Sequence, residues 1–320
     1  MWVVKKSIAT AMVFFIFTLF SVEAWAKPKI GVLLFTQEST YRETLNGIMD
    51  QLKKEGLGES NADFIEENAE GNKSKAAELS KKFAASHMDL VIVLGTSATL
   101  IAMNEIKDVP IVFSMIYDPV DSKIVRDWKS SGNNTTGSSN NMPMSNVIHA
   151  LKGLAPVKKL AVLYQPDERN SVSQLRDLQE GQIISQIKLV PVPITKKEDV
   201  TRILPNVIGR ADALYISGGS ILGEMVPTIA DMMTKSKMIT ATNLKGRVEK
   251  GLLLGVCANS YAVGLLAGEK AAKVLRGAKP SSIPIGTLKK FDVLVNMRTA
   301  KAGQFQIPPD FMKRVAGKIE

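Results

Sequence analysis

The side chains best suited to hold a ligand follow the ends of short apolar runs. Six such runs, which we expect to be strands, each lead into hydroxyls, amides, carboxylates or glycines. In an open parallel sheet, ligands bind beyond the carboxyl ends of the strands, where loop amides and helix N-termini converge. The sequence therefore predicts one polar binding site formed by Thr36, Gln37, Tyr41, Thr96, Ser97, Tyr117, Asp118, Asp167, Glu168, Asn170, Ser171, Gly218, Gly219, Ser220 and Asn243.

Several of these residues also have an ordinary structural explanation. Thr96 and Ser97 are suited to cap a helix N-terminus. Tyr-Asp-Pro around Asp118 and Pro-Asp-Glu around Glu168 are common turn sequences, although the two carboxylates could instead pair with a charged ligand. The combination is more informative than its members, because six strand ends that open into hydroxyls and amides suit a small polar ligand.

The residue patterns of enzymes are missing from the sequence. The first strand continues as VLLF after Gly31, so it has no G-x-G-x-x-G turn for a dinucleotide, and no G-x-S-x-G elbow occurs. The two histidines, His87 and His149, fall in a helix end and in an amphipathic helix, and Cys257 is the single cysteine. We expect no catalysis, no cofactor and no metal. The alternative, an exported hydrolase, would need one of these histidines as its base.

The first 26 residues have the pattern of a cleavable signal peptide. Two lysines precede the 13-residue apolar run 8–20, and Ala24-Trp25-Ala26 forms a small-x-small cleavage site. An uncleaved anchor is the alternative, but about 18 apolar residues are needed to span a bilayer. No cysteine stands near the cleavage point for a lipid anchor. We therefore expect a periplasmic protein with residues 1–26 removed.

The formal net charge of +10 does not indicate a nucleic-acid partner. Lysines are spread over the whole chain among Glu and Asp, without a block of like charges or a basic stripe with aromatic residues. We interpret the excess as solvated surface and expect a monomer that binds no nucleic acid.

After residue 27, short β-rich runs alternate with helical stretches, the order typical of a parallel sheet covered on both faces. The first series predicts strands at 29–35, 62–68, 89–95 and 109–116, with helices after the first strand and at 73–86 and 97–106. The segment 130–141, SSGNNTTGSSNN, is too rich in Gly, Ser and Asn for a helix or a central strand. The second series predicts strands at 159–165, 189–194, 213–217, 237–242 and 251–258, with helices at 173–187, at 200–209 and through Met232.

The two series predict an α/β protein of two doubly wound parallel-sheet lobes joined by a hinge. A helix at 262–277, a strand at 291–297 and a short tail helix would cross between the lobes. We assign 27–140 with 258–285 to one lobe, and 141–257 with 286–320 to the other.

Five segments together resemble one known family: 107–120, 132–139, 154–171, 212–217 and 266–302. The chain is similar to the ABC-transporter substrate-binding proteins that include tryptophan- and tyrosine-binding members, which have a type I periplasmic-binding-protein fold. The resemblance covers the mature chain. It implies ligand contacts at Thr96, Asp118, Glu168, Asn170 and Ser171.

The sequence departs from the family pattern in two later loops, where amino-acid-binding members carry acidic residues that help to hold the ligand's ammonium. Here 217–220 and 243–247 contain no carboxylate, and Lys245 and Arg247 stand in the second loop. Since a buried ammonium without a partner costs several kcal/mol, either Asp118 and Glu168 hold it, or the ligand is not an α-amino acid. An anionic or neutral ligand stays open.

The resemblance implies an exported protein that captures a small polar or aromatic, amino-acid-like solute between its lobes and delivers it to an ABC permease in the inner membrane. The alternative is a periplasmic ligand-sensing module for a membrane receptor kinase. The effector domain of a transcription factor is disfavoured by the signal peptide and by the lack of a helix-turn-helix before Lys29.

Overall fold

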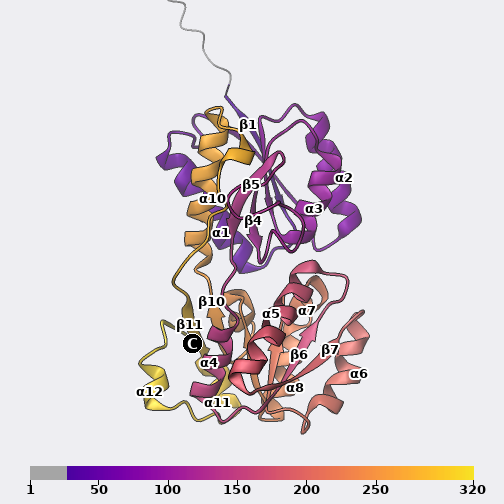
Figure 1. Ribbon diagram of the computed structural model, residues 1–320, viewed down its shortest axis with the longest axis vertical. Coiled ribbons are helices and arrows are strands. Elements are labelled where there is room, and N and C mark those ends of the chain that lie inside the picture. The colour runs from indigo at the N-terminus through magenta and orange to yellow at the C-terminus, as the bar shows by residue number, and fades with distance from the viewer. Residues whose placement is uncertain (1–26) are drawn as a thin grey trace, which may run out of the picture.

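The computed structural model describes residues 27–320 and has two α/β lobes, one above the other in Figure 1. The predicted signal peptide lies outside the described residues. Within them, each helix is too short or too polar to cross a bilayer.

The first lobe is built on a fully parallel five-stranded sheet in the order β2-β1-β3-β4-β5. Its strands are β1 (Lys29–Leu34), β2 (Asp63–Asn68), β3 (Leu90–Leu94), β4 (Ile111–Ile116) and β5 (Thr135–Ser139). Its helices are α1 (Ser39–Lys54), α2 (Lys73–Ala85), α3 (Thr96–Glu105), α10 (Ser260–Leu275) and the 3₁₀ turn η1 (Pro280–Ser282).

Helices cover both faces of this sheet, so its central strands are buried throughout and are apolar except for Ser114 of β4. Every residue of β3 and β4 is buried, as expected for parallel strands between two helical layers. Leu45 and Ile48 of α1 pack with Ala267 of α10 against one face, while Phe83 of α2 and Ala102 of α3 pack against the other.

The second lobe contains a seven-stranded sheet in the order β12-β11-β10-β9-β8-β6-β7, which is parallel except for the β10–β11 pair. Its strands are β6 (Lys159–Tyr164), β7 (Lys188–Pro193), β8 (Ala213–Ile216), β9 (Ile239–Thr242), β10 (Leu254–Cys257), β11 (Asp292–Asn296) and β12 (Gly317–Ile319). Its helices are α4 (Ser145–Leu154), α5 (Arg169–Ser185), α6 (Lys197–Val207), α7 (Ser220–Glu224), α8 (Val226–Lys235), α9 (Lys245–Glu249), α11 (Met297–Ala302) and α12 (Pro309–Met312).

The polar segment 130–141 contains a strand that the sequence did not indicate. All five residues of β5, TTGSS, are buried at the edge of the first sheet. Three of their four hydroxyls donate to main-chain carbonyls, among them Thr136 to Ile283 at 3.0 Å and Ser139 to Tyr117 at 2.7 Å. The fourth, of Thr135, donates to the side-chain oxygen of Asn133 at 2.7 Å. Because these hydroxyls are satisfied by neighbouring acceptors, a strand without large apolar side chains can be buried. The first lobe therefore has five strands instead of the four expected.

The short elements of the second lobe also differ from the expectation. The helix expected to run through Met232 is two helices, α7 and α8, and neither α9 nor β12 was expected. These elements span three to ten residues, which is too short for a clear hydrophobic period.

Three connections join the two sheets, after β5, after β10 and before β11. After β10 the chain returns to the first lobe as α10, which lies along α1 in Figure 1. The loops that follow strands of both sheets meet between the lobes.

Candidate binding site between the lobes

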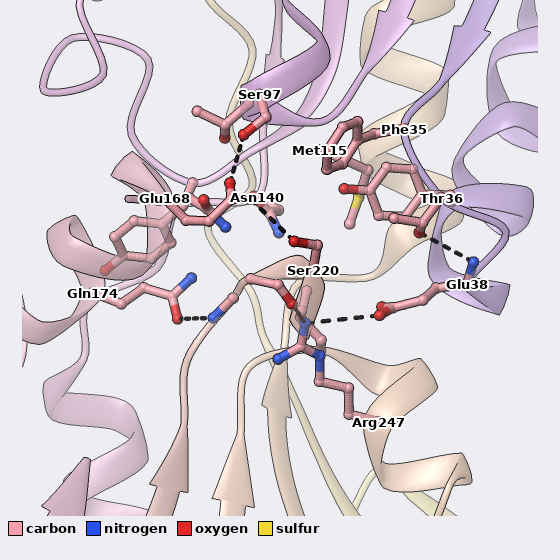
Figure 2. Close-up of a pocket in the computed structure, with 17 residues that line it drawn as sticks. Phe35, Thr36, Glu38, Ser97, Met115, Asn140, Glu168, Gln174, Ser220 and Arg247 are labelled. Carbon is pink, nitrogen blue, oxygen red and sulfur yellow. Dashed lines mark hydrogen bonds and ion pairs between the residues drawn. The ribbon is translucent and has the colours of Figure 1, made fainter. Parts of the chain in front are cut away.

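A pocket lies where the two lobes meet, and the space between its walls is about 530 Å³ when the open solvent at its mouth is included. The lining residues lie near the carboxyl ends of β1, β3, β4 and β5 in the first lobe and of β6, β8 and β9 in the second. Figure 2 shows their side chains. The lining residues are Phe35, Thr36, Glu38, Tyr41, Thr96, Ser97, Met115, Tyr117, Asn140, Glu168, Asn170, Gln174, Gly218, Gly219, Ser220, Leu244 and Arg247.

Glu168 is a buried carboxylate that joins the two walls. Its side chain is 4% exposed. Ser97 of the first lobe donates a hydrogen bond to Glu168 Oε2 at 2.5 Å, and Ser220 of the second lobe donates to Oε1 at 3.2 Å. Lys73 Nζ lies 3.8 Å from Oε1. Since Ser97 is in the first turn of α3, the positive end of that helix also stabilises the negative charge.

Helix α3 begins at the pocket without a side-chain cap. The structure has Gly95 at the N-cap, with φ of 106°, and places Thr96 and Ser97 inside the helix, so the capping explanation for these two residues is wrong. Tyr41 Oη lies 2.8 Å from the position that a Cβ of Gly95 would occupy. The left-handed backbone and this close approach both require glycine. Thr96 Oγ1 is left buried without a hydrogen-bond partner.

Two tyrosines bring phenol groups to the pocket in protonated form. Burial, and then the charges of Glu38 and Glu168, raise the pKa of Tyr41 well above its ordinary value, and Arg247 lowers it by less. Burial, followed by the nearby Asp177 carboxylate, likewise raises the pKa of Tyr117. Tyr117 donates to Asp177 at 2.7 Å, so its hydroxyl joins the first lobe to α5.

The loop between β8 and α7 is held from below by side chains of the second lobe. Gln174 Oε1 accepts a hydrogen bond from the Gly218 amide at 2.9 Å. Arg247 donates to the carbonyl of Ser217 and, at 2.8 Å, to that of Gly219. These bonds fix the main chain of the loop, and Ser220 at its end reaches Glu168 (Figure 2).

Ten of the fifteen predicted site residues line this pocket. They come from both lobes: Thr36, Tyr41, Thr96, Ser97, Tyr117, Glu168, Asn170, Gly218, Gly219 and Ser220.

The other five predicted residues lie around the pocket and have structural partners or face solvent. Asp118 accepts the amides of Val120 and Asp121 as a turn residue, Asp167 pairs with Lys73 on the surface, and Gln37 lines a neighbouring groove. Ser171 is hydrogen-bonded to Ser217, and Asn243 accepts from the Tyr215 hydroxyl at 3.1 Å.

Seven lining residues were not predicted: Phe35, Glu38, Met115, Asn140, Gln174, Leu244 and Arg247. Asn140 follows the unexpected strand β5. Met115 has φ of 57°, and the register of β4 against β5 shifts between Phe113 and Ile116. Such a bulge re-aims a side chain, and the sequence of β4, IVFSMI, gives no sign of it. Glu38 follows β1 and Arg247 follows β9, and both lie in segments that the sequence analysis considered for ligand binding. Their position after a strand end is the signal that could have identified them as site residues.

Unpartnered polar atoms are concentrated in the pocket. Within residues 27–320, seven buried side-chain nitrogen or oxygen atoms have no hydrogen-bond partner. Four of them belong to lining residues, namely Thr96 Oγ1, Asn140 Oδ1, Asn170 Oδ1 and Arg247 Nε. Because native proteins satisfy most buried polar groups, this concentration indicates a site for a polar ligand.

The two histidines do not belong to this site. His87 and His149 are exposed, at the end of α2 and on α4, and neither lines the pocket. The pocket therefore brings no imidazole to its carboxylates.

Comparisons with known proteins agree with a binding site of this kind. A family model described as ABC transporter substrate binding protein matches residues 29–319. A tyrosine-binding protein from Clostridioides difficile is 25% identical over 280 residues, which are 87% of this chain and 81% of that protein. The ABC domain in complex with L-Trp from Streptococcus pneumonia has a TM-score of 0.87 and 26% identity, covering 92% of this chain and all of that one.

A third similar protein was solved in a different state. The ligand-free, open structure of a substrate binding protein with adhesive properties from Clostridium difficile has a TM-score of 0.72 and 27% identity, again covering 92% of this chain and all of that one. The family match spans nearly all of the described residues, and the two α/β lobes agree with the type I periplasmic-binding fold of these neighbours. This chain is thus a member of the ABC transporter substrate-binding protein family.

Proposed function

We propose that this protein captures a small polar or aromatic, amino-acid-like solute between its lobes and delivers it to an ABC permease. The observation that carries the proposal is the pocket itself, because buried Glu168 and four residues that each hold an unpartnered polar atom line a space shared by both lobes. Phe35, Met115 and Leu244 add apolar surface to the same walls. A solute with an ammonium group and an aromatic or apolar body fits this combination.

Capture operates through closure of the lobes. Glu168 bonds to Ser97 across the interface, so a ligand that touches both walls binds the closed arrangement more tightly and favours it. The arrangement of the two lobes supports this, since the TM-score is higher to the L-Trp complex than to the ligand-free, open relative. In this proposal, residues 27–140 with 258–285 and 141–257 with 286–320 are the bodies that move, and the protein makes and breaks no bond.

Delivery to a permease follows from the family, and export follows from the N-terminal pattern. The apolar run 8–20 and the Ala-Trp-Ala site support cleavage after Ala26 and release into the periplasm. The closed, loaded monomer is then the form presented to the permease.

A thermal-shift screen of residues 27–320 against amino acids, nucleosides, small organic anions and aromatic acids tests this function. A ligand at 100 times its Kd stabilises the fold by about 2.7 kcal/mol, which is several degrees in melting temperature for a chain of this size. We expect a shift with an amino-acid-like solute and one-to-one stoichiometry by calorimetry. The absence of any shift across these classes would contradict the proposed function.

The change Glu168→Gln tests the role of the buried carboxylate. The amide keeps the shape and one acceptor but loses the charge, so the Kd for an ammonium-bearing solute should rise about thirtyfold, equivalent to about 2 kcal/mol. Glu66→Gln removes an exposed carboxylate that pairs with Arg42 outside the pocket and should leave the Kd unchanged. Equal affinities of the Glu168 variant and the control would show that Glu168 does not hold the ligand.

A further inference from the structure

Arg247 is an unusual pocket residue because it is a nearly inaccessible cation. Its side chain is 2% exposed. The two terminal nitrogens donate to the carbonyls of Ser217 and Gly219, while Nε has no partner among the described residues. A buried donor of this kind is satisfied by an acceptor, and an anionic acceptor suits a guanidinium best.

Glu38 reaches Arg247 from the opposite lobe. Its Oε1 lies 3.7 Å from Arg247 Nη2, too far for a hydrogen bond, and its side chain is 10% exposed. A Cβ on Gly223 of α7 would lie 2.1 Å from Glu38 Oε1 and 3.1 Å from Arg247 Nη2, so the two groups occupy space that a larger residue at position 223 would take from them. No side chain of the described residues donates a hydrogen bond to the Glu38 carboxylate. Figure 2 shows the two groups facing each other at one side of the pocket.

The charges on the pocket wall are therefore Glu38, Glu168 and Arg247. A solute with only an anionic group would meet two carboxylates, and one with only a cationic group would leave Arg247 Nε unsatisfied. A zwitterion satisfies both signs, with its cation near the carboxylates and its anion at the guanidinium.

We propose that Arg247 is a specificity residue that binds the anionic group of a zwitterionic solute, while Glu38 and Glu168 take its cationic group. The inference rests on the proposed function and deepens it, because it names the charge pattern of the solute. The two later loops, 217–220 and 243–247, contain no carboxylate. Here Glu38 supplies negative charge from the first loop, and Arg247 of the loop 243–247 supplies a cation.

Three probes that share a 4-hydroxyphenylethyl skeleton and differ in their charged groups test the inference by titration calorimetry of residues 27–320. L-tyrosine carries both charges, tyramine carries only the ammonium, and 3-(4-hydroxyphenyl)propionate carries only the carboxylate. Wild type should bind L-tyrosine at least about tenfold more tightly than either analogue. Arg247→Met should weaken L-tyrosine about thirtyfold or more and leave tyramine unchanged or tighter, because the cation that opposes tyramine is gone.

Two further variants keep the test decisive if Arg247→Met disturbs the loop of Ser217 and Gly219. Arg247→Lys retains the charge and should preserve the preference for L-tyrosine over tyramine with reduced affinity. Gly223→Ala displaces the Glu38 carboxylate and should weaken tyramine and L-tyrosine together. Arg202→Met, which changes an exposed arginine that pairs with Asp199 in the same lobe, is the matched control and should leave all three probes unaffected.

The outcomes separate the inference from the function on which it rests. If Arg247→Met weakens L-tyrosine and tyramine by the same factor, Arg247 only supports the loop, and the inference is wrong while the proposed function stands. If wild type prefers either singly charged analogue, the zwitterion assignment is also wrong. If wild type binds none of the probes and no solute of the wider screen, the proposed function itself fails.

Discussion

Asp167 and Glu168 are adjacent carboxylates in very different surroundings. Glu168 is buried between the lobes, whereas the side chain of Asp167 is 62% exposed and pairs with Lys73 of the opposite lobe at 2.9 Å. Burial alone would raise the pKa of Asp167, but the hydrogen bond and charge of Lys73 outweigh it and lower that pKa. Burial lowers the pKa of Lys73, and its carboxylate partners outweigh this and raise it. The Lys73–Asp167 pair therefore stabilises the closed arrangement of the lobes by an amount that depends on pH.

The lowered pKa of Asp167 and the raised pKa of Lys73 determine how this stabilisation changes with pH. If the pair separates when the lobes open, the pKa of Asp167 and the pKa of Lys73 each return towards the ordinary value of that side chain. The contribution to closure is complete above the ordinary pKa of Asp167 and is lost as the pH falls through the lowered one. At the alkaline end, the contribution of the pair is complete below the ordinary pKa of Lys73. It is lost as the pH rises through the raised pKa that Lys73 has in the closed protein.

We predict that Asp167→Asn raises the ligand Kd about two- to fivefold at pH 7, because exposed pairs contribute less than about 1 kcal/mol. The ratio of variant to wild-type Kd should fall towards one as the pH drops below the ordinary pKa of Asp167 and through the lowered pKa that it has in the closed protein. Calorimetry of both proteins across pH measures this ratio. A ratio that stays constant from neutral to acid pH would rule out the Lys73–Asp167 pair as its source.

At the level of elements, α1 and α10 pack against each other at close range. The two helices meet through glycines: a Cβ on Gly47 would lie 2.2 Å from the Tyr261 carbonyl oxygen, and one on Gly264 would lie 2.1 Å from that of Thr44. These obstacles are backbone atoms, which cannot rotate aside as a side chain can. The pairing matters for the whole molecule, because α10 follows β10 of the second lobe and returns the chain to the first.

Gly264→Ala should therefore destabilise the protein although alanine favours helix. The gain in propensity is about 1 kcal/mol, whereas overpacking against rigid backbone costs about 1–3 kcal/mol or more. We expect a lower denaturant midpoint and melting temperature. Gly181→Ala in α5 is the control, since its Cβ would meet only the flexible Ile148 Cδ1 at 3.3 Å, and it should be neutral or stabilising. Equal stability of the two variants would contradict this account of the helix contact.

At the level of the molecule, the lobes are joined by a charged cluster beside the pocket. Arg176 of α5 pairs with Asp121 of the first lobe, lies 4.0 Å from Asp118 and is bonded to Asp177 at 2.9 Å. Ser173 also donates to Asp121. Asp118, expected to contact the ligand, thus lies next to this interlobe cluster instead of in the pocket wall.

Removing the cation of this cluster should favour the open molecule. In Arg176→Met, Asp118 and Asp121 face Asp177 across the interface without a counter-charge, so closure should lose about 1 kcal/mol and the Kd should rise about fivefold. Small-angle X-ray scattering should record a larger radius of gyration without ligand. Arg276→Met, whose partner Glu55 is in the same lobe, should change neither quantity, and an Arg176 variant that behaves like this control would contradict the role of the cluster.

Local patterns were sufficient to predict most of the architecture. Apolar runs such as KLAVLYQ predicted β6 and its neighbours, because parallel strands between helical layers must be apolar on both sides. The rule that ligands lie beyond strand ends led to Glu168, Ser97 and Ser220, which do meet in one pocket.

Tertiary structure alone decided the rest. Strand β5 exists because carbonyls far along the chain satisfy its hydroxyls, and Met115 enters the pocket through a bulge that depends on the strand beside it. The contact between Glu38 and Arg247 requires the first and second lobes to meet over Gly223. Composition and periodicity determine which segments become buried strands and helices, since those depend on near neighbours in sequence. The charge pattern of the pocket depends on groups about 200 residues apart, so it is set only when the lobes come together.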